Sequence, residues 1–128
     1  MNPLEASSSS AGSLKKRRVF VVDDEGQIAD LLSLFLRDAG FDVDTFQDGH
    51  SCLIKAQDSQ PDVVVTDVSM PGMDGIALAK ILRTQCPNCK VILISGNPEW
   101  KTRPQALDGF VLLPKPFVLS QLLRLIDT

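Results

Sequence analysis

Acidic side chains directly follow two of the apolar runs that read as buried β-strands. Asp23 and Asp24 follow the run at 17–22, and Asp67 follows the β-branched run at 62–66. Carboxylates brought within a few ångströms of one another repel strongly unless a cation lies between them. Mg²⁺ suits such a set, because it takes one or two carboxylates together with a phosphate and keeps several of its waters. The acidic set therefore predicts a magnesium site.

A hydroxyl and an ammonium group follow two further apolar runs of the same kind. Ser95 and Gly96 come after one of these runs, and Lys115 comes after the other. An aspartate can attack phosphorus and form an aspartyl phosphate, whose oxygens then need charged and hydrogen-bonding partners. Mg²⁺, the Lys115 ammonium and the Ser95 hydroxyl are partners of the right type, and Gly96 leaves room for the group. The whole set makes sense if Asp67 accepts a phosphoryl group.

Strand and helix patterns alternate along the chain in a way that brings these side chains to one place. Five short apolar or alternating runs are typical of strands: 17–22, 41–46, 62–66, 90–94 and 109–113. Helical patterns between them imply βαβ crossovers and a mostly parallel sheet. In such a sheet ligands bind beyond the carboxyl ends of the strands, which is where the polar residues fall.

The helix patterns are of unequal strength. The first has helical spacing at Ile28, Leu31, Leu32, Phe35 and Leu36, with Gly40 just past its end. A weaker helix is predicted over 49–58, with Asp48 as its N-cap, and Asp74 is predicted to begin the next one. The last helix carries its apolar stripe at Leu119, Leu122, Leu123 and Ile126.

The segment 97–108 departs from this regularity. It contains Pro98 and Pro104, and a proline inside a helix removes a hydrogen bond and clashes with the preceding turn. We therefore expect a short or irregular helix there. Trp100, in the same segment, is interpreted as partly buried packing near the rim of the predicted site.

Composition excludes several classes of protein. Hydrophobic residues make up 44% of the 128 residues and charged residues 23%, which is ordinary for a globular domain. Residues 19–128 hold 9 basic and 15 acidic groups, a balance of −6, which argues against a nucleic-acid-binding face. No apolar run approaches the roughly 18–20 residues that span a bilayer, so we expect no membrane segment.

The N-terminal segment differs from the rest. Residues 1–16 are rich in serine and poor in apolar side chains, so we predict a disordered tail ahead of one domain at 17–128. Three cysteines and no secretory signal favour a cytoplasmic protein.

Four motifs carry a family resemblance. VVDDE (21–25), TDVSMPGMDG (66–75), ISG (94–96) and LPKPF (113–117) resemble the receiver domain of two-component response regulators. The match runs in order over nearly all of 17–127. The resemblance implies an α/β flavodoxin-like (βα)5 fold, a doubly wound parallel sheet with strand order 2-1-3-4-5.

The resemblance also implies a role for each acidic residue. Asp67 is similar to the phosphoacceptor that takes its phosphoryl group from a kinase phosphohistidine in the presence of Mg²⁺. Asp24 is similar to the direct metal ligand, and Asp23 to the residue that acts through a metal-bound water. The backbone carbonyl of Ser69 corresponds to a third protein ligand.

Further implications concern the phosphoryl group and the partners. Ser95 resembles the hydroxyl that moves toward the phosphoryl group, Lys115 resembles the lysine that pairs with it, and the Lys115–Pro116 bond is expected to be cis. The implied partners are a histidine kinase or histidine phosphotransfer protein and a downstream protein. Neither nucleic acid nor an external enzymatic substrate is expected, and Leu125 is a weak pointer to a homodimer.

The chain departs from the resemblance at one position of the expected switch. Receivers usually carry an aromatic residue three positions before the lysine, and here that position is Leu112. Phe110 lies five positions before Lys115 and does not replace it without a shift in strand register. The usual coupling of a hydroxyl to an aromatic side chain is therefore open.

Alternatives remain beside this interpretation. One is a phosphorylation-independent docking module with a receiver fold. Another is a haloacid-dehalogenase-like phosphatase, which would need a second acid where Ser69 stands. Cys86 and Cys89 have CxxC spacing. We interpret them as ordinary thiols, with redox sensing and intermolecular metal binding as the alternatives. His50 reads as a surface residue.

Overall fold

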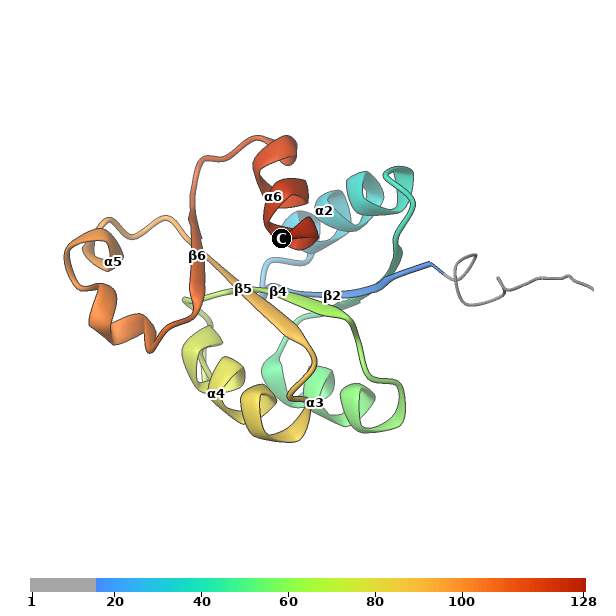
Figure 1. The fold of residues 1–128 in the computed structure, drawn as a ribbon, viewed down its shortest axis with the longest axis horizontal. Helices are drawn as coiled ribbons and strands as arrows, with labels where there is room; N and C mark the ends of the chain where they lie inside the picture. The colour runs from blue at the N-terminus through green and yellow to red at the C-terminus, as the bar shows by residue number, and fades with distance from the viewer. Residues whose placement is uncertain (1–15) are drawn as a thin grey trace, which may run out of the picture.

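One parallel sheet organises the molecule. The computed structural model describes residues 16–128, and its five strands lie in the order β3-β2-β4-β5-β6 (Figure 1). Along the chain this is the order 2-1-3-4-5, so the predicted flavodoxin-like topology is confirmed. The strands are β2 (Arg18–Val22), β3 (Asp42–Phe46), β4 (Val63–Asp67), β5 (Lys90–Ser95) and β6 (Val111–Pro114).

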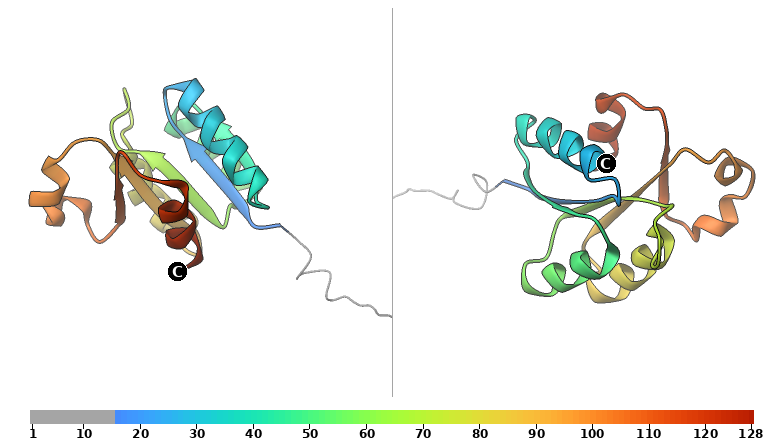
Figure 2. Two further views of the ribbon diagram at one scale, coloured as in Figure 1. Left: turned by 90° about the horizontal axis from the view of Figure 1, so that it is seen from above. Right: turned by 180° about the vertical axis from the view of Figure 1, so that it is seen from behind.

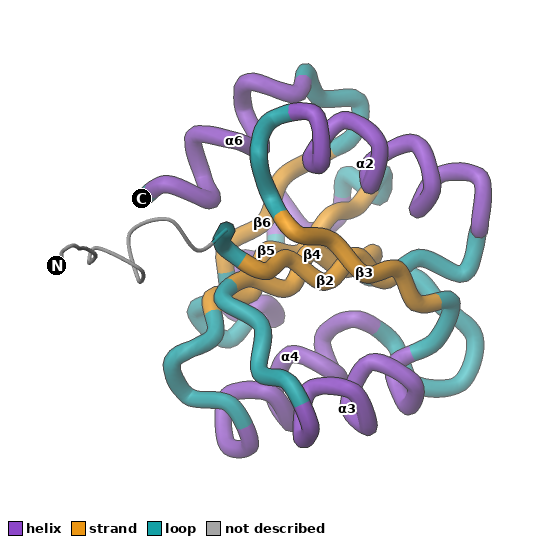
Figure 3. Tube along the Cα trace, turned by 90° about the vertical axis from the view of Figure 1, so that its right-hand side faces the viewer, coloured by secondary structure: helices purple, strands orange, loops and turns teal. Residues whose placement is uncertain are grey.

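Helices cover both faces of this sheet. Helices α2 (Gly26–Asp38) and α6 (Leu119–Asp127) lie on one face, and α3 (Gly49–Asp58) and α4 (Gly75–Gln85) lie on the other (Figures 1 and 3). This is the doubly wound arrangement that parallel strands with helical crossovers produce.

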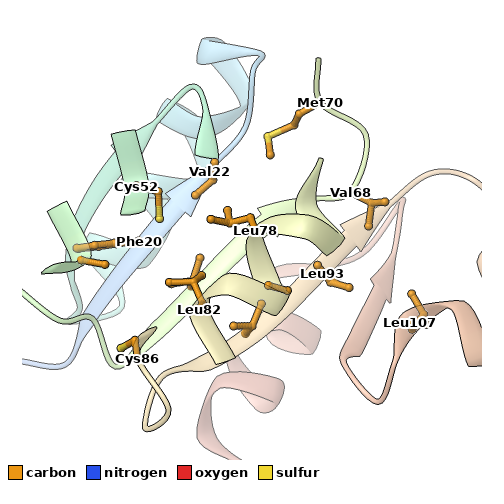
Figure 4. Close-up of a cluster of buried hydrophobic side chains, with 14 residues drawn as sticks. Phe20, Val22, Cys52, Val68, Met70, Leu78, Leu82, Cys86, Leu93 and Leu107 are labelled. Atoms are coloured by element: carbon orange, nitrogen blue, oxygen red, sulfur yellow. The ribbon is translucent and has the colours of Figure 1, made fainter. Parts of the chain in front are cut away.

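Both faces of the central strands are buried because helices cover them both. The β-branched run of β4 pairs Val65 with Val21 on one side and with Ile92 on the other. Side chains on the α3–α4 face form one core cluster, which includes Phe20, Leu78 and Leu82 (Figure 4). Side chains on the α2–α6 face form the second. The two clusters fix the sheet from both sides.

Local signals predicted from sequence begin and end the helices. The Asp48 carboxylate accepts a hydrogen bond from the Ser51 amide at 2.8 Å, and Asp74 accepts one from the Ala77 amide at 2.8 Å. Both are the predicted N-caps. Gly40 has a φ of +102° just past α2, a conformation that suits glycine. Helices α3 and α4 therefore start where the sequence indicates.

Helix α2 buries only part of the apolar stripe that its spacing suggests. The buried residues are Ala29, Ser33 and Leu36, while Leu31 is 52% exposed and Phe35 42% exposed. Leu36 is buried as the spacing predicts. Leu31 and Phe35 remain at the surface, beside the loop that follows β6.

The proline-bearing segment is irregular, as predicted. It forms a four-residue helix, α5 (Glu99–Thr102), and a 3-10 helix, η1 (Pro104–Leu107), which lie beside β6 away from the other helices (Figure 2). The last strand begins at Val111 rather than at the predicted residue 109. Asp108 and Gly109 both have positive φ values, 53° and 84°, so the chain is still turning there.

Two predictions for the chain as a whole have different outcomes. The serine-rich segment, which was predicted to be disordered, lies outside the described residues except for Lys16. Within residues 16–128, none of the helices has the length and apolar character needed to cross a membrane.

Two leucines on α2 offer a matched test of this packing. Leu36 is fully buried and Leu34 is 63% exposed. We expect Leu36→Ala to lower the free energy of unfolding by about 2–5 kcal/mol, because it leaves a cavity. Leu34→Ala is expected to change it by no more than about 0.5 kcal/mol. Urea unfolding of both variants measures the difference, and equal losses would contradict the burial described.

Candidate metal and phosphoryl site

Three carboxylates meet at the carboxyl edge of the sheet. Asp67 is the last residue of β4, and Asp23 and Asp24 directly follow β2, which is its neighbour in the sheet. One oxygen from each of the three side chains lies within 4.8 Å of the others. Parallel pairing of β2 with β4 aligns the two strand ends, so the predicted acidic cluster forms because of the strand register.

Asp23 is the most buried member of this cluster. Its residue is 3% exposed, and its carboxylate accepts a hydrogen bond from the Glu25 amide at 2.9 Å. Burial raises the pKa of this carboxyl group, and the Glu25 hydrogen bond opposes the shift only in part. The fold therefore holds a carboxylate where its charged form is disfavoured.

Asp67 is also partly buried, and among the described residues it has one cationic neighbour. Burial raises its pKa, and Lys115 lowers it by Coulombic attraction, while Asp23 and Asp24 raise it further. The Lys115 Nζ lies 3.7 Å from Asp67 Oδ1. One ammonium group does not balance three carboxylates, so the cluster retains an excess of negative charge.

The donor set fits a hard divalent cation. It offers carboxylate oxygens only, partly desolvated and closely spaced, with Asp24 exposed to solvent. Mg²⁺ favours such oxygens and retains waters on its open side. Asp23, Asp24 and Asp67 are the residues that would hold it. The ion would relieve the repulsion that raises the carboxyl pKa values and would leave room for a phosphoryl oxygen.

Ser95 and Lys115 are fixed to one another by the last two strands. The Lys115 amide donates to the Ser95 carbonyl at 2.8 Å, and Ser95 pairs in register with Pro114. The Ser95 hydroxyl oxygen accepts a hydrogen bond from the Asn97 amide at 3.0 Å. The hydroxyl is thus tied to its own loop in this conformation, at the same sheet edge as Asp67.

Two further predicted residues flank this pair. A methyl group added at Gly96 would come no closer than 3.9 Å to Lys115 Cβ, so space is open there, in keeping with the predicted role. The Lys115–Pro116 peptide bond is cis.

Ser69 is exposed in the loop between β4 and α4, and the metal-binding role of its carbonyl stays a prediction.

Comparisons with known proteins show which family the chain belongs to. The family model described as the response regulator receiver domain matches residues 19–127. The chain belongs to the response regulator receiver family. The transcriptional regulator NtrC of Salmonella typhimurium is 34% identical over 111 residues, which are 85% of this chain and 24% of NtrC. This receiver therefore spans about a quarter of the length of that relative.

Solved structures give the same result for the fold. The chemotaxis protein CheY4 of Vibrio cholerae has a TM-score of 0.77 and 33% identity, covering 88% of this chain and 98% of CheY4. The response regulator TrrA of Thermotoga maritima, solved in complex with Mg²⁺ and BeF, has a TM-score of 0.78 and 28% identity. That match covers 87% of this chain and 96% of TrrA. The receiver fold expected from the motifs is therefore confirmed.

Gly75 is a residue that sequence reasoning missed. A Cβ at this position would lie 2.9 Å from the Cα of Val68 and closer still to the carbonyl oxygen of Asp67. The Gly75 amide donates to the Val68 carbonyl at 2.8 Å. Glycine therefore lets the start of α4 contact the backbone of Asp67 and Val68 directly. The motif contains this glycine, but only the contact shows its purpose.

The position of the usual receiver aromatic is occupied by a leucine that packs inward. Leu112 is partly buried against the α3–α4 core cluster. Phe110 lies in the turn before β6, where the guanidinium carbon of Arg83 lies 4.1 Å from its ring centroid. Arg83 also forms an ion pair with Asp108 at 3.0 Å. Phe110 is therefore engaged elsewhere and does not substitute for the missing aromatic.

Two of the three cysteines lie at the opposite end of the sheet from the carboxylates. Cys86 and Cys89 span the turn between α4 and the start of β5, with the Cys89 amide donating to the Cys86 carbonyl at 3.0 Å. Burial raises the pKa of Cys89, and it raises that of Cys52 to about 12. Such thiols stay protonated near neutral pH and react slowly. This supports the interpretation of Cys89 as an ordinary thiol. His50 is exposed, as predicted.

The contact at Gly75 can be tested against Gly96. We expect Gly75→Ala to lower the free energy of unfolding by several kcal/mol, because the new methyl group displaces the backbone of Asp67 or the whole start of α4. Gly96→Ala adds the same methyl group in open space and is expected to cost less than about 1 kcal/mol. Thermal or urea unfolding of both variants measures this, and a tolerated Gly75→Ala would contradict the close approach.

The raised carboxyl pKa values give a pH-dependent prediction. At pH values between the ordinary carboxyl pKa and the raised pKa of Asp23, this side chain binds more protons in the native state than in the unfolded chain. The contribution of Asp23 to the free energy of unfolding therefore falls as the pH rises through that interval. We expect Asp23→Asn, without Mg²⁺, to be more stabilising at about pH 7 than at about pH 4.

Added Mg²⁺ is expected to offset the loss of folding free energy that the charged Asp23 carboxylate causes in the wild type. At a concentration 100-fold above its dissociation constant it would stabilise the fold by about 2.7 kcal/mol, and Asp23→Asn should reduce this gain. Urea unfolding with Mg²⁺ or with a chelator measures both effects. The same gain in wild type and variant would mean that the ion binds elsewhere.

Proposed function

We propose that Asp67 accepts a phosphoryl group from a phosphohistidine, with Mg²⁺ held by Asp23, Asp24 and Asp67. The observation that supports this most directly is the joint position of the groups. Three carboxylates have oxygens within 4.8 Å of one another, and the Lys115 ammonium lies 3.7 Å from the Asp67 carboxylate. This arrangement has the nucleophile, the cation site and a fixed counter-charge at one sheet edge.

The transfer is an in-line exchange of one bond to phosphorus for another. An Asp67 carboxylate oxygen attacks the phosphorus, the bond from phosphorus to the imidazole nitrogen breaks, and the electron pair stays on that nitrogen, which takes up a proton. When bound, Mg²⁺ neutralises charge on the phosphoryl oxygens. Lys115 pairs with another of these oxygens and stays in place through its backbone bond to Ser95.

The surface beside the acceptor is suited to a protein donor. A groove of about 550 Å³ runs between α2 and the loop after β6, and Asp23 and Lys115 lie among its lining residues. Its walls are otherwise mostly apolar and include Leu31, Phe35 and Phe117. A histidine kinase or histidine phosphotransfer protein that docks an apolar helix there would bring its phosphohistidine to the acceptor.

The proposed outcome of transfer is a signal rather than a released product. A phospho group carries about −1.5 to −2 charges near neutral pH, and it would shift Ser95 and the neighbouring loop toward a state that a downstream protein binds. The three cysteines are free thiols in the structure, which suits the cytoplasm as the proposed compartment.

Intact-mass spectrometry after incubation with acetyl phosphate tests this function. We expect the wild type to gain one phosphoryl group when Mg²⁺ is present and none when a chelator removes it. Asp67→Asn should abolish the gain. Asp58→Asn makes the same change at an exposed aspartate at the end of α3 and should leave the gain intact.

A second donor distinguishes the remaining outcomes. If acetyl phosphate fails, a phosphorylated histidine phosphotransfer protein supplies the same chemistry with the docking contacts. If the phosphotransfer protein phosphorylates the wild type, and Phe35→Ala slows this transfer, the result supports docking of the donor in the proposed groove. The absence of any phosphoryl gain from either donor would reject phosphotransfer and favour a receiver fold used only for docking.

A further inference from the structure

A chain of hydrogen bonds connects Ser95 to the short helix α5. The Ser95 hydroxyl oxygen accepts from the Asn97 amide at 3.0 Å. The Asn97 side chain then accepts from the Glu99 amide at 3.0 Å and donates to the Glu99 carboxylate at 3.2 Å. Glu99 is the first residue of α5. The position of the Ser95 hydroxyl therefore bears directly on where α5 begins.

Trp100 is the next residue of this helix and has an unmet hydrogen-bonding need. Its side chain packs against the α3–α4 core cluster, to which Leu107 and Leu112 also belong. Its indole Nε1 is buried and has no hydrogen-bond partner among the described residues. A buried donor without an acceptor destabilises the conformation that holds it. A movement of α5 that exposes the Trp100 indole N–H to water would therefore recover this free energy.

The strand β6 offers no aromatic side chain to follow a movement of Ser95. Leu112 occupies the relevant position, and Phe110 is packed against Arg83. Trp100 is the aromatic residue that a continuous set of bonds joins to Ser95. Helix α5 has only four residues and lies at the side of the sheet (Figure 2), so it can shift without disturbing the other helices.

We propose that Ser95, Asn97, Glu99 and Trp100 form a relay that reports phosphorylation to the surface, an inference that rests on the proposed acceptor role of Asp67. A phosphoryl oxygen on Asp67 attracts the Ser95 hydroxyl as a donor, because hydrogen bonds to charged acceptors are the stronger ones. The hydroxyl turns and releases the Asn97 amide. Helix α5 then loosens, and Trp100 turns outward until its indole N–H reaches water.

Tryptophan fluorescence measures this movement at a single site. Trp100 is the only tryptophan of the chain, which also has no tyrosine. On phosphorylation of the wild type we expect the emission to shift to longer wavelength and its quenching by acrylamide to increase. Intact mass gives the phosphorylated fraction of the same sample, so the shift is compared at matched occupancy.

Variants of Asn97 separate a relay from a passive loop. Asn97→Ala removes the bonds to Glu99, so its unphosphorylated form should already show the long-wavelength emission and should shift little further. Asn97→Ser retains a short acceptor for the Glu99 amide and should restore part of the response. Asn88→Ala, an exposed position in the turn between α4 and β5, is the matched control and should respond as the wild type does.

The outcomes of the two measurements are separable. A phosphoryl gain without any change in Trp100 emission would overturn the relay and leave the acceptor role standing. The relay would also be overturned if unphosphorylated Asn97→Ala has the emission of the wild type and shifts on phosphorylation as the wild type does. No phosphoryl gain from either donor would instead overturn the proposed function itself.

Discussion

Repulsion among carboxylates crowded at a partly desolvated edge of the sheet governs the properties of this site. Asp23 and Asp67 have raised pKa values because burial disfavours their charge and because neighbouring carboxylates repel it. The Lys115 ammonium offsets only part of this cost. The charged carboxylates are disfavoured without added positive charge. Such a site is suited to binding a cation together with an anionic group that the cation coordinates.

The fold supplies the rigidity that such a site requires. Parallel pairing fixes the ends of β2, β4 and β5 at one edge, and buried apolar side chains hold both faces of the sheet. Gly75 lets the start of α4 support the backbone of Asp67 directly. The segment after β5 is the exception, because it has only a four-residue helix and an irregular turn. Stable strands thus position the carboxylates, and the segment after β5 is the least regular part of the site's surroundings.

The sequence predicted the parts that local patterns and strand order determine. The caps at Asp48 and Asp74 follow from short-range signals, and the convergence of the three aspartates follows from parallel topology. The strand order was expected only from the family resemblance. The buried face of α2 was predictable only in part, because its apolar spacing indicates Leu36 but does not show that the small residues Ala29 and Ser33 are buried beside it. The role of Gly75 and the bonds from Ser95 to Glu99 depend on distances between segments, which residue types alone do not give.

Chemical trapping of the phosphoryl bond identifies the residue that accepts the group. Borohydride reduces an aspartyl phosphate to homoserine, so reduction after phosphotransfer, followed by peptide mass spectrometry, marks the residue that carried the group. If Asp67 is the phosphoacceptor, homoserine is expected at position 67 and nowhere else, in a Mg²⁺-dependent manner. Homoserine at Asp23 or Asp24, or a phosphoryl group found on Ser95 or His50, would contradict it.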